Sequence, residues 1–410
     1  MRSTHETIVI GAGQAGLAAS YFLTAAGREH VILERGEIAE RWRSSRWDSF
    51  TLVGPNWSSS LPGGEYRGPD PEGYMGRDEL VAQFVRYARS FGAPVERANV
   101  RLMYRDVHTR RLVLHTEDDT LAADNVIVAT GPYQRARIPM AARAVPAAIQ
   151  QVHTNDYRNP AQLRDGAVLV VGSGQSGCQI AEELLDAGRT VYLATGACGW
   201  YPRRYRGKDN MWWRNEMGFF DRPLDLSLAH KLRTGAVPVQ TGAGGGHDLN
   251  QRTLAVKGAI LAGHFAGVRD GEIRFADDLD DNLARSDKAA RDLVTAIDGF
   301  ISARGLRAPV EESDLFFQSR IERVASLDRR AISAIVWATG YDLDFGWCDL
   351  PVFDEQGYPI QRQGVTGERG VYFLGLQWMH TRKSGIILGV GRDACHVVEH
   401  LTEREAARAA

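Results

Sequence analysis

The chain has 410 residues, a formal net charge of −2 and an ordinary share of charged and apolar residues. Its length exceeds what one hydrophobic core usually serves, so we expect two or more domains. The near-zero net charge argues against nucleic acid or an anionic membrane as a partner, and no apolar run is long enough to span a bilayer. A strand predicted to begin within a few residues of Met1 leaves no room for a signal peptide, which predicts a cytoplasmic protein.

The first informative pattern is a Gly-x-Gly-x-x-Gly motif directly after the apolar run at 7–10. A helix over about 14–26 and a strand over 30–34 are predicted to follow it. The first glycine permits a tight turn, the second lets a pyrophosphate approach the backbone, and the third lets helix and strand pack closely. The phosphate then contacts free N–H groups at the helix N-terminus. The residues predicted to bind the cofactor here are Gly11, Gly13, Gln14, Ala15 and Gly16.

The acidic residue at the end of the second strand indicates which nucleotide this unit binds. Glu34 closes the strand about twenty residues past the motif and is followed by Arg35. A carboxylate at this place accepts hydrogen bonds from ribose hydroxyls and repels a 2′-phosphate. Glu34 and Arg35 are therefore predicted to border the adenosine half of FAD or NAD, and the alternative for Glu34 is a solvated strand end.

A second copy of the pattern follows the apolar run at 167–171, with a helix predicted over about 175–187 and a strand over 190–194. Gly27 and Gly188 fall where the two helices should end. Two such units imply two dinucleotides, and two dinucleotides imply electron transfer between them. The residues predicted to bind the second cofactor are Gly172, Gly174, Gln175, Ser176 and Gly177.

The second unit lacks an acid at the position that Glu34 occupies in the first, and basic residues follow instead. Guanidinium groups bind phosphate in a bidentate way, so this pattern favours the 2′-phosphate of NADPH. Which arginine makes the contact is left open, and a solvated basic loop is the alternative. The candidates are Arg203, Arg204 and Arg206.

Two buried strands end in Ala-Thr-Gly, at 129–131 and 338–340. Such small residues allow the backbone to run close to a neighbour or a cofactor. We interpret these segments as the places where the chain passes between domains. The residues predicted to line the cofactors are Ala129, Thr130, Gly131, Thr339 and Gly340.

The predicted fold is α/β with two Rossmann-type three-layer domains, the second inserted in the first. The FAD-binding domain would comprise 1–160 and 336–410, with an amphipathic helix over about 77–91. The NADPH-binding domain would comprise 161–335, with an irregular excursion at about 196–271. No Cys-x-x-Cys or other metal-ligand spacing occurs, so no metal site is expected. All four cysteines, Cys178, Cys198, Cys348 and Cys395, are predicted to be buried apolar side chains.

The chain resembles the class B flavin-dependent monooxygenases, which include the flavin-containing and the Baeyer–Villiger monooxygenases. Beside the two motifs and the Ala-Thr-Gly segments, the likeness rests on Trp42, Gly54-Pro55-Asn56-Trp57, Leu61-Pro62-Gly63, His153 and Tyr157. Ala147 and Ile149 stand where the family signature before the second motif has Phe and Gly, so the chain looks like a divergent branch. The resemblance implies that NADPH reduces FAD, that a C4a-(hydro)peroxyflavin forms with O2, and that one oxygen atom passes to a small organic substrate by N- or S-oxygenation or a Baeyer–Villiger step.

Three residues are candidates for catalytic roles. Asn56 is expected near the flavin, where its amide would hydrogen-bond the reacting ring, or else it stabilises its own turn. His153 is expected near NADPH by the family match, or else it bonds to backbone. Lys383, with His380 and Arg382, would stabilise negative charge on reduced flavin, or else belongs to a solvated basic cluster.

Three more residues are predicted to contact the flavin itself. Trp42 walls the isoalloxazine site or fills core. A strand predicted over 371–374 returns to the flavin and places Gly375 and Gln377 at the ribitol, since the Asp that many related reductases carry there is missing.

The sequence also allows functions other than oxygen transfer. An NAD(P)H:acceptor oxidoreductase that reduces a quinone or a carrier stays open, whereas a disulfide reductase is disfavoured because no cysteine pair accompanies either motif. A nucleotide-binding regulatory subunit is the non-enzymatic alternative. The expected partners are a small-molecule substrate and O2, without nucleic acid or membrane, and a homodimer is compatible with the sequence.

Overall fold

The larger of the two main sheets forms around the N-terminal strand and is mixed. The computed structural model describes residues 3–311 and 321–409. The parallel strands of this sheet run in the order β3-β2-β1-β6-β22, and β6 also begins an antiparallel branch through β5 to β4. Their bounds are β1 (Ser3–Ile10), β2 (His30–Glu34), β3 (Val95–Arg97), β4 (Leu102–Arg105), β5 (Leu112–His115), β6 (Thr120–Val128) and β22 (Val371–Phe373).

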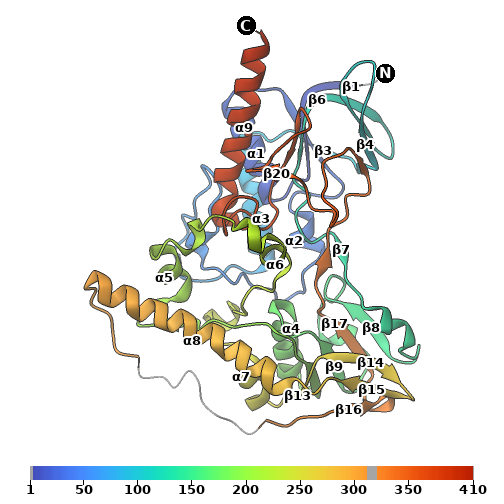
Figure 1. Ribbon diagram of the computed structural model, residues 1–410, viewed down its shortest axis with the longest axis vertical. Helices are drawn as coiled ribbons and strands as arrows, with labels where there is room; N and C mark the ends of the chain where they lie inside the picture. The colour runs from blue at the N-terminus through green and yellow to red at the C-terminus, as the bar shows by residue number, and fades with distance from the viewer. Residues whose placement is uncertain (1–2, 312–320, 410) are drawn as a thin grey trace.

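Four helices belong to this first unit. They are α1 (Gln14–Ala25), α2 (Glu40–Ser44), α3 (Arg77–Ser90) and α9 (Ile387–Ala409). α1 and α9 pack on each other beside the sheet, so the chain end returns to the N-terminal motif (Figure 1). Short strands β19 (Cys348–Asp349), β20 (Gln361–Arg362) and β21 (Val365–Thr366) extend the sheet.

The second sheet is parallel throughout, in the order β13-β10-β9-β17-β8. Its strands are β8 (Gln150–His153), β9 (Val168–Val171), β10 (Val191–Ala194), β13 (Ile260–Ala262) and β17 (Ala334–Trp337). The helices α4 (Gln175–Asp186), α7 (Gln251–Val256) and α8 (Leu279–Arg304) accompany it, as does a small sheet of β14 (Phe265–Arg269), β15 (Glu272–Phe275) and β16 (Ser326–Asp328). β8 joins this sheet although it lies in the range 1–160 that the sequence analysis places in the first domain.

The predicted α/β class with two Rossmann-type units is confirmed, and both motif helices start at the predicted residue. Gly27 and Gly188 follow those helices with φ of +65° and +75°, the left-handed conformation in which glycine commonly ends a helix. The stretch 196–271 is more ordered than predicted. It contains β11 (Arg204–Tyr205), β12 (Lys208–Asp209), α5 (Asn210–Glu216), α6 (Ala229–Thr234), α7, β13 and β14.

Two short strands mark the places where the chain crosses between the units. β7 (Arg135–Ala136) follows the first Ala-Thr-Gly segment, and β18 (Tyr341–Asp342) follows the second. They pair in an antiparallel ribbon, so both crossings lie side by side between the two sheets (Figure 1).

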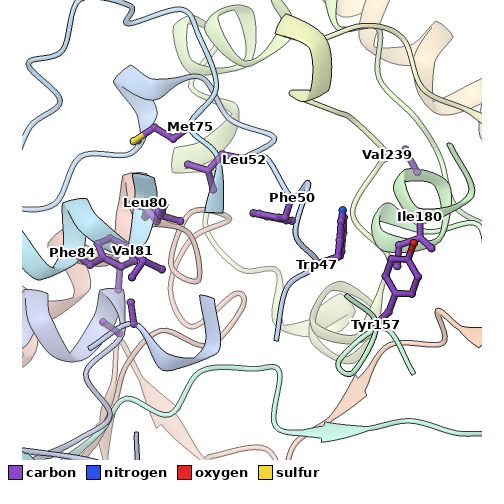
Figure 2. Close-up of a cluster of buried hydrophobic side chains, with 14 of the residues drawn as sticks. Trp47, Phe50, Leu52, Met75, Leu80, Val81, Phe84, Tyr157, Ile180 and Val239 are labelled. Carbon is purple, nitrogen blue, oxygen red and sulfur yellow. The ribbon is translucent and has the colours of Figure 1, made fainter. Parts of the chain in front are cut away.

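One hydrophobic cluster spans both units. Figure 2 shows Trp47 and Phe50 between the apolar face of α3, which carries Leu80 and Phe84, and a group from the second unit that includes Tyr157. Because apolar contacts continue across the junction, the two units are held at a defined separation rather than joined only by linkers.

Candidate functional site

The two glycine motifs adopt nearly the same geometry. A Cβ added at Gly11 would lie 2.8 Å from the carbonyl oxygen of Ala129, and one at Gly172 would lie 2.5 Å from that of Ala338. The first glycine of each motif therefore packs directly on an Ala-Thr-Gly segment. At Gly13 and Gly174 an added Cβ would meet nothing within 4 Å. The second glycine of each motif thus faces open space, as a cradle for a pyrophosphate requires.

The helices that follow these turns begin without a capping side chain. Gly13 is the N-cap of α1 and Gly174 that of α4; neither helix has a side-chain cap or an acidic residue in its first turn. The first N–H groups of a helix need partners, and the macrodipole there favours an anion. Both helix starts fit the phosphates of a dinucleotide.

The third glycine of each motif serves packing. A Cβ at Gly16 would overlap the carbonyl oxygen of Gly11, and one at Gly177 would overlap that of Gly172. Ala15 faces Gly375, where an added Cβ would lie 2.7 Å from the Ala15 Cβ. The structure therefore brings Gly375 to the start of α1, beside the first motif.

Glu34 lies at the edge of the first cradle with its carboxylate buried. Its Oε2 accepts a hydrogen bond of 2.8 Å from the Ala12 N–H, and its Oε1 accepts one of 3.1 Å from the Gly36 N–H. The carboxylate thus links the end of β2 to the glycine turn, where a ribose would lie. Arg35 is exposed beside it.

Three contacts hold the two Ala-Thr-Gly segments in place. Gln134 donates 3.1 Å and 2.7 Å hydrogen bonds to Thr130 Oγ1 and the Gly131 carbonyl. Thr339 Oγ1 donates to the Arg137 carbonyl oxygen. Neither Gly131 nor Gly340 would meet another atom within 4 Å if it carried a Cβ, so both segments border open space next to the cradles.

His153 fastens the second of these segments. Its Nε2 lies 3.1 Å from the Gly340 carbonyl oxygen, and its Nδ1 lies 3.1 Å from the Asn155 N–H. Burial lowers the pKa of His153, so the ring is neutral, with Nε2–H donating and Nδ1 accepting. Both ring nitrogens are engaged with main chain, which gives His153 a positioning role.

The three candidate arginines of the second unit lie in different surroundings. Arg203 is 2% exposed, and its Nη2 lies 2.6 Å from Asp209 Oδ1. Its Nη1 donates to the Val53 carbonyl at 2.7 Å, so the side chain joins the second unit to the first. Arg206 pairs with Asp298 at 3.0 Å. Arg204 is exposed at β11.

Asn56 ties its own loop together. Its Nδ2 donates to the Asp70 carbonyl at 2.9 Å, and its Oδ1 accepts from the Met75 N–H at 2.8 Å. The turn-stabilising alternative describes these contacts. Next to this loop is a hollow of about 290 Å³ between the two units, lined by Trp57, Pro71, Glu72, Trp212, Asn215 and Glu216.

The segment after β22 packs against the second unit. Lys383 Nζ lies 2.6 Å from Asp221 Oδ1, and the main chain of 380–383 bonds to that of 220–224. His380 lies 3.9 Å from Asp393, and Arg382 lies over the Phe219 ring at 4.1 Å. The basic cluster is thus partly buried, and each of its three side chains contacts a neighbouring group.

The same segment also reaches the first motif. Gln14 Nε2 donates to the Gly385 carbonyl at 3.0 Å, and the Gln377 carbonyl accepts from the Tyr358 hydroxyl at 3.1 Å. The structure therefore brings Gln14, Gly375 and Gln377 into one corner of the first unit.

The second motif is held by a residue that the sequence analysis did not single out. Gln175 and Gln240 exchange hydrogen bonds, in which Gln240 N–H donates to Gln175 Oε1 at 3.1 Å and Gln175 Nε2 donates to the Gln240 carbonyl. Ser176 and Gly177 continue α4 from this point. No local pattern marks Gln240, because its partner lies 65 residues away.

Trp42 lies at the junction with the crossing ribbon. The Arg46 guanidinium lies 5.2 Å from the centroids of both Trp42 and Tyr133, and Tyr133 in turn contacts Tyr341 of β18. Trp42 also packs against the core cluster. It therefore walls the junction and fills core at the same time.

The cysteines have no redox geometry. All four thiols are free; Cys178, Cys198 and Cys348 are buried as predicted, whereas Cys395 on α9 is partly exposed. Burial raises the pKa of Cys198 and of Cys348 to about 12 and that of Cys178 well above its usual value. Such thiols are poor nucleophiles at neutral pH.

Metal-ligand clusters and membrane-spanning helices are both missing from the described residues. Over 3–311 and 321–409, no group of three or more His, Cys, Asp or Glu side chains is placed to hold a metal ion. None of the helices in those same ranges is long and apolar enough to cross a bilayer.

Comparison with known proteins identifies the family. The family model described as pyridine nucleotide-disulphide oxidoreductase matches residues 8–212. A protein of Geobacillus kaustophilus named "Uncharacterized oxidoreductase CzcO-like" is 31% identical over 404 residues, 98% of this chain and 99% of that protein. The chain belongs to the pyridine nucleotide-disulphide oxidoreductase family. It is an oxidoreductase, and its family indicates a flavin and a nicotinamide nucleotide as cofactors.

The predicted resemblance to flavin-dependent monooxygenases is also confirmed. A probable indole-3-pyruvate monooxygenase of Arabidopsis thaliana is 33% identical over 193 residues, 46% of each chain. A solved flavin-containing monooxygenase from Stenotrophomonas maltophilia has a TM-score of 0.62 with 22% identity, over 98% of this chain and 99% of that one. At this identity the structural likeness establishes the shared fold.

Proposed function

We propose that the protein is an NADPH-dependent FAD monooxygenase that transfers one oxygen atom from O2 to a small organic molecule. The observation that carries the proposal is the pair of matched cradles: two open glycine turns before uncapped helices, held at a fixed separation by one shared core. When bound, the flavin would take hydride from the nicotinamide and activate oxygen, which is chemistry that no side chain supplies.

The first cradle takes FAD in this proposal, and the second takes the nicotinamide nucleotide. Gly13 admits the pyrophosphate of FAD, Glu34 accepts from its ribose, and the corner of Gln14, Gly375 and Gln377 contacts its flavin half. The flavin unit comprises the strands of the first sheet, and the nicotinamide unit begins near β8, since that strand pairs with β17.

The chain's own residues would position and enclose the cofactors. His153 holds the Gly340 turn at the crossing, and Gln134 holds the Thr130–Gly131 turn. Asn56 keeps the 54–75 loop closed over the junction. Lys383, paired with Asp221, joins the segment after β22 to the second unit beside the first cradle. With both cofactors bound, these contacts would limit the access of water to the space between the cradles, which favours both electron transfer and oxygen transfer.

The preference for NADPH rests on Arg204. No acid ends β10, so the 2′-phosphate is not repelled, and Arg204 is exposed at β11, whereas Arg203 is committed to Asp209 and Arg206 to Asp298. A guanidinium at the surface remains available to a phosphate.

The reactive cysteine pair that a disulfide reductase needs is missing, since the buried thiols have raised pKa values. This leaves oxygen transfer or reduction of a diffusible acceptor. Purified protein should carry FAD and oxidise NADPH under air. With ¹⁸O2 and a panel of amines, thioethers, ketones and 2-oxo acids, at least one product should gain one labelled oxygen atom. NADPH oxidation supported only by quinones, with no labelled product, would refute the monooxygenase assignment and favour the acceptor reductase.

A further inference from the structure

A buried cation without an anion lies between the two cradles. Arg214, on α5, is 4% exposed, and among the described residues its guanidinium makes one hydrogen bond, from Nη2 to Gln240 Oε1 at 3.2 Å. Its Nε is buried without a partner. Within the described part of the chain, no carboxylate forms an ion pair with Arg214. Desolvation by burial is the largest cause that lowers the pKa of this guanidinium to about 10, and the charge of the nearby Asp209 offsets only part of it.

Aromatic rings surround this guanidinium instead of carboxylates. It lies 5.0 Å from the centroid of Tyr201, 4.9 Å from that of Phe220 and 5.7 Å from that of Phe219. Cation–π contacts compensate only part of the hydration that a buried guanidinium loses. A buried cation whose direct contacts are aromatic rings and one amide is therefore expected to have a missing anionic partner.

A second arginine shares one of these rings. The Arg382 guanidinium lies over Phe219 at 4.1 Å and over Trp378 at 5.4 Å. It also forms no ion pair with a carboxylate of the described residues, and burial lowers its pKa. Its positive charge is one of the causes that lower the pKa of Arg214. The fold thus holds two like charges near one another, which an anion between them would relieve.

The acids of this region are already committed. Asp209 accepts from Arg203 at 2.6 Å, from the Tyr74 hydroxyl at 2.6 Å and from the Met211 N–H at 2.7 Å. Asp221 pairs with Lys383 at 2.6 Å. Neither carboxylate is free to neutralise the two arginines.

Short chains of contacts link the two arginines to both cradles. Arg214 bonds to Gln240, and Gln240 exchanges hydrogen bonds with Gln175, which follows the open Gly174. On the other side, the segment that carries Arg382 continues to Gly385, whose carbonyl accepts from Gln14 of the first motif. The pair therefore lies in the region where both cofactors would be approached.

We propose that Arg214 and Arg382 bind the carboxylate of an organic acid substrate, with its apolar body against Tyr201, Phe219 and Phe220. This inference rests on the proposed function, of which it names the substrate class. The same guanidinium chemistry would bind a nucleotide phosphate. However, each cradle already offers its own uncapped helix N-terminus to a pyrophosphate, so these two arginines are in excess of that need.

The test is equilibrium binding to the FAD-loaded enzyme by calorimetry. The probes are phenylacetate and octanoate, each compared with its uncharged primary amide. In the native sequence we expect at least one acid to bind at least tenfold more tightly than its amide. Arg214→Gln and Arg382→Gln should each weaken acid binding at least tenfold, Arg214→Lys should weaken it less, and the exposed Arg89→Gln on α3 should leave it unchanged. The dissociation constant of NADPH should stay within twofold throughout.

Several outcomes would overturn the inference. Equal affinity for acids and amides in the native sequence would do so without any variant, which covers the case that Arg214→Gln does not fold. A loss of NADPH affinity with unchanged acid binding would assign the arginines to a nucleotide phosphate. The binding measurement does not require catalytic turnover, so its result is independent of the test of the proposed function. If acids bind better than amides but no product carries ¹⁸O, the anion site stands and the monooxygenase assignment fails. If only uncharged compounds gain oxygen and acids bind no better than amides, the monooxygenase assignment stands and the anion site fails.

Discussion

Gly13→Ala should strongly weaken flavin binding and leave the fold intact. Gly13 has φ −86° and ψ −170°, an extended conformation that alanine adopts freely, and its added Cβ would meet nothing within 4 Å. The hydrogen bond from Leu17 N–H to the Gly13 carbonyl is kept. The free energy of unfolding of the apoprotein should therefore change by less than about 1 kcal/mol. Gly11→Ala is not equivalent, because φ there is +106° and the Cβ would press on Ala129.

The size of the affinity loss follows from what occupies that space. α1 has no capping side chain, so its first N–H groups are left for the pyrophosphate. Hydrogen bonds to a charged group are worth about 1.5–3 kcal/mol each. A methyl group that displaces the pyrophosphate from two of them would cost about 3–6 kcal/mol, which is a rise of about 10²- to 10⁴-fold in the dissociation constant of FAD.

The assay is the FAD-to-protein ratio after purification, followed by titration of the apoprotein with FAD. Gly174→Ala is the matched control, since its φ of −76° and ψ of −171° and its open surroundings repeat those of Gly13. It should retain FAD and lose affinity for the nicotinamide nucleotide. Gly27→Ala, at φ +65° and away from both cradles, should cost about 1 kcal/mol of stability and affect neither cofactor. A Gly13→Ala protein that is fully loaded with FAD would refute the cradle assignment.

Four further variants test the remaining contacts. Arg203→Met should lower the free energy of unfolding by about 3–5 kcal/mol in urea titrations, because Asp209 would stay buried without its cation. Arg204→Gln should raise the KM for NADPH and leave the KM for NADH unchanged. Equal effects on both nucleotides would contradict the 2′-phosphate proposal. Glu34→Gln should destabilise the apoprotein by about 1–3 kcal/mol and weaken FAD binding, since an amide cannot accept both N–H groups. Burial lowers the pKa of His153 below its usual 6.5, so the unfolded chain binds more protons than the folded chain near that pH. The free energy of unfolding should therefore fall as the pH drops below about 6.5, and His153→Gln should flatten this slope. An unchanged slope would argue against the buried neutral ring.

The fold could be predicted because its signals are local. An apolar strand, a glycine turn and a helix lie within about twenty residues of each other in both units, and each glycine role depends on its immediate neighbours. Gly11 and Ala129 are distant in sequence, yet the small residues of Ala-Thr-Gly predict the close approach of the two backbone segments. The sequence places the strand β8 in the first unit, because neither β8 nor β17 carries a local signal that the two strands pair.

The side-chain site was harder to predict, because its contacts join distant parts of the chain. Arg203 looks like a phosphate ligand beside β10, but its partners include the Val53 carbonyl, 150 residues earlier. The stretch 196–271 is predicted as irregular because its elements are short, and part of it, 220–224, is held by main-chain hydrogen bonds to 380–383 that no local periodicity indicates. The aromatic residues around Arg214 were visible in the sequence, but nothing local indicates that they enclose a cation.

The way the two units are joined limits how the enzyme would work. Arg203 bonds to Val53 of the first unit and Asp209 of the second, and Tyr74 of the first unit donates to the same Asp209. Rotation about the β7–β18 ribbon would break the Arg203–Val53 and Tyr74–Asp209 hydrogen bonds and expose the shared core. Buried polar groups that lose their partners carry a desolvation penalty, so such a rotation is costly even though the ion pair itself would persist. We therefore expect the two cradles to keep their distance through the reaction cycle. Hydride transfer would then depend on movement of the nicotinamide, and not on closure of the domains.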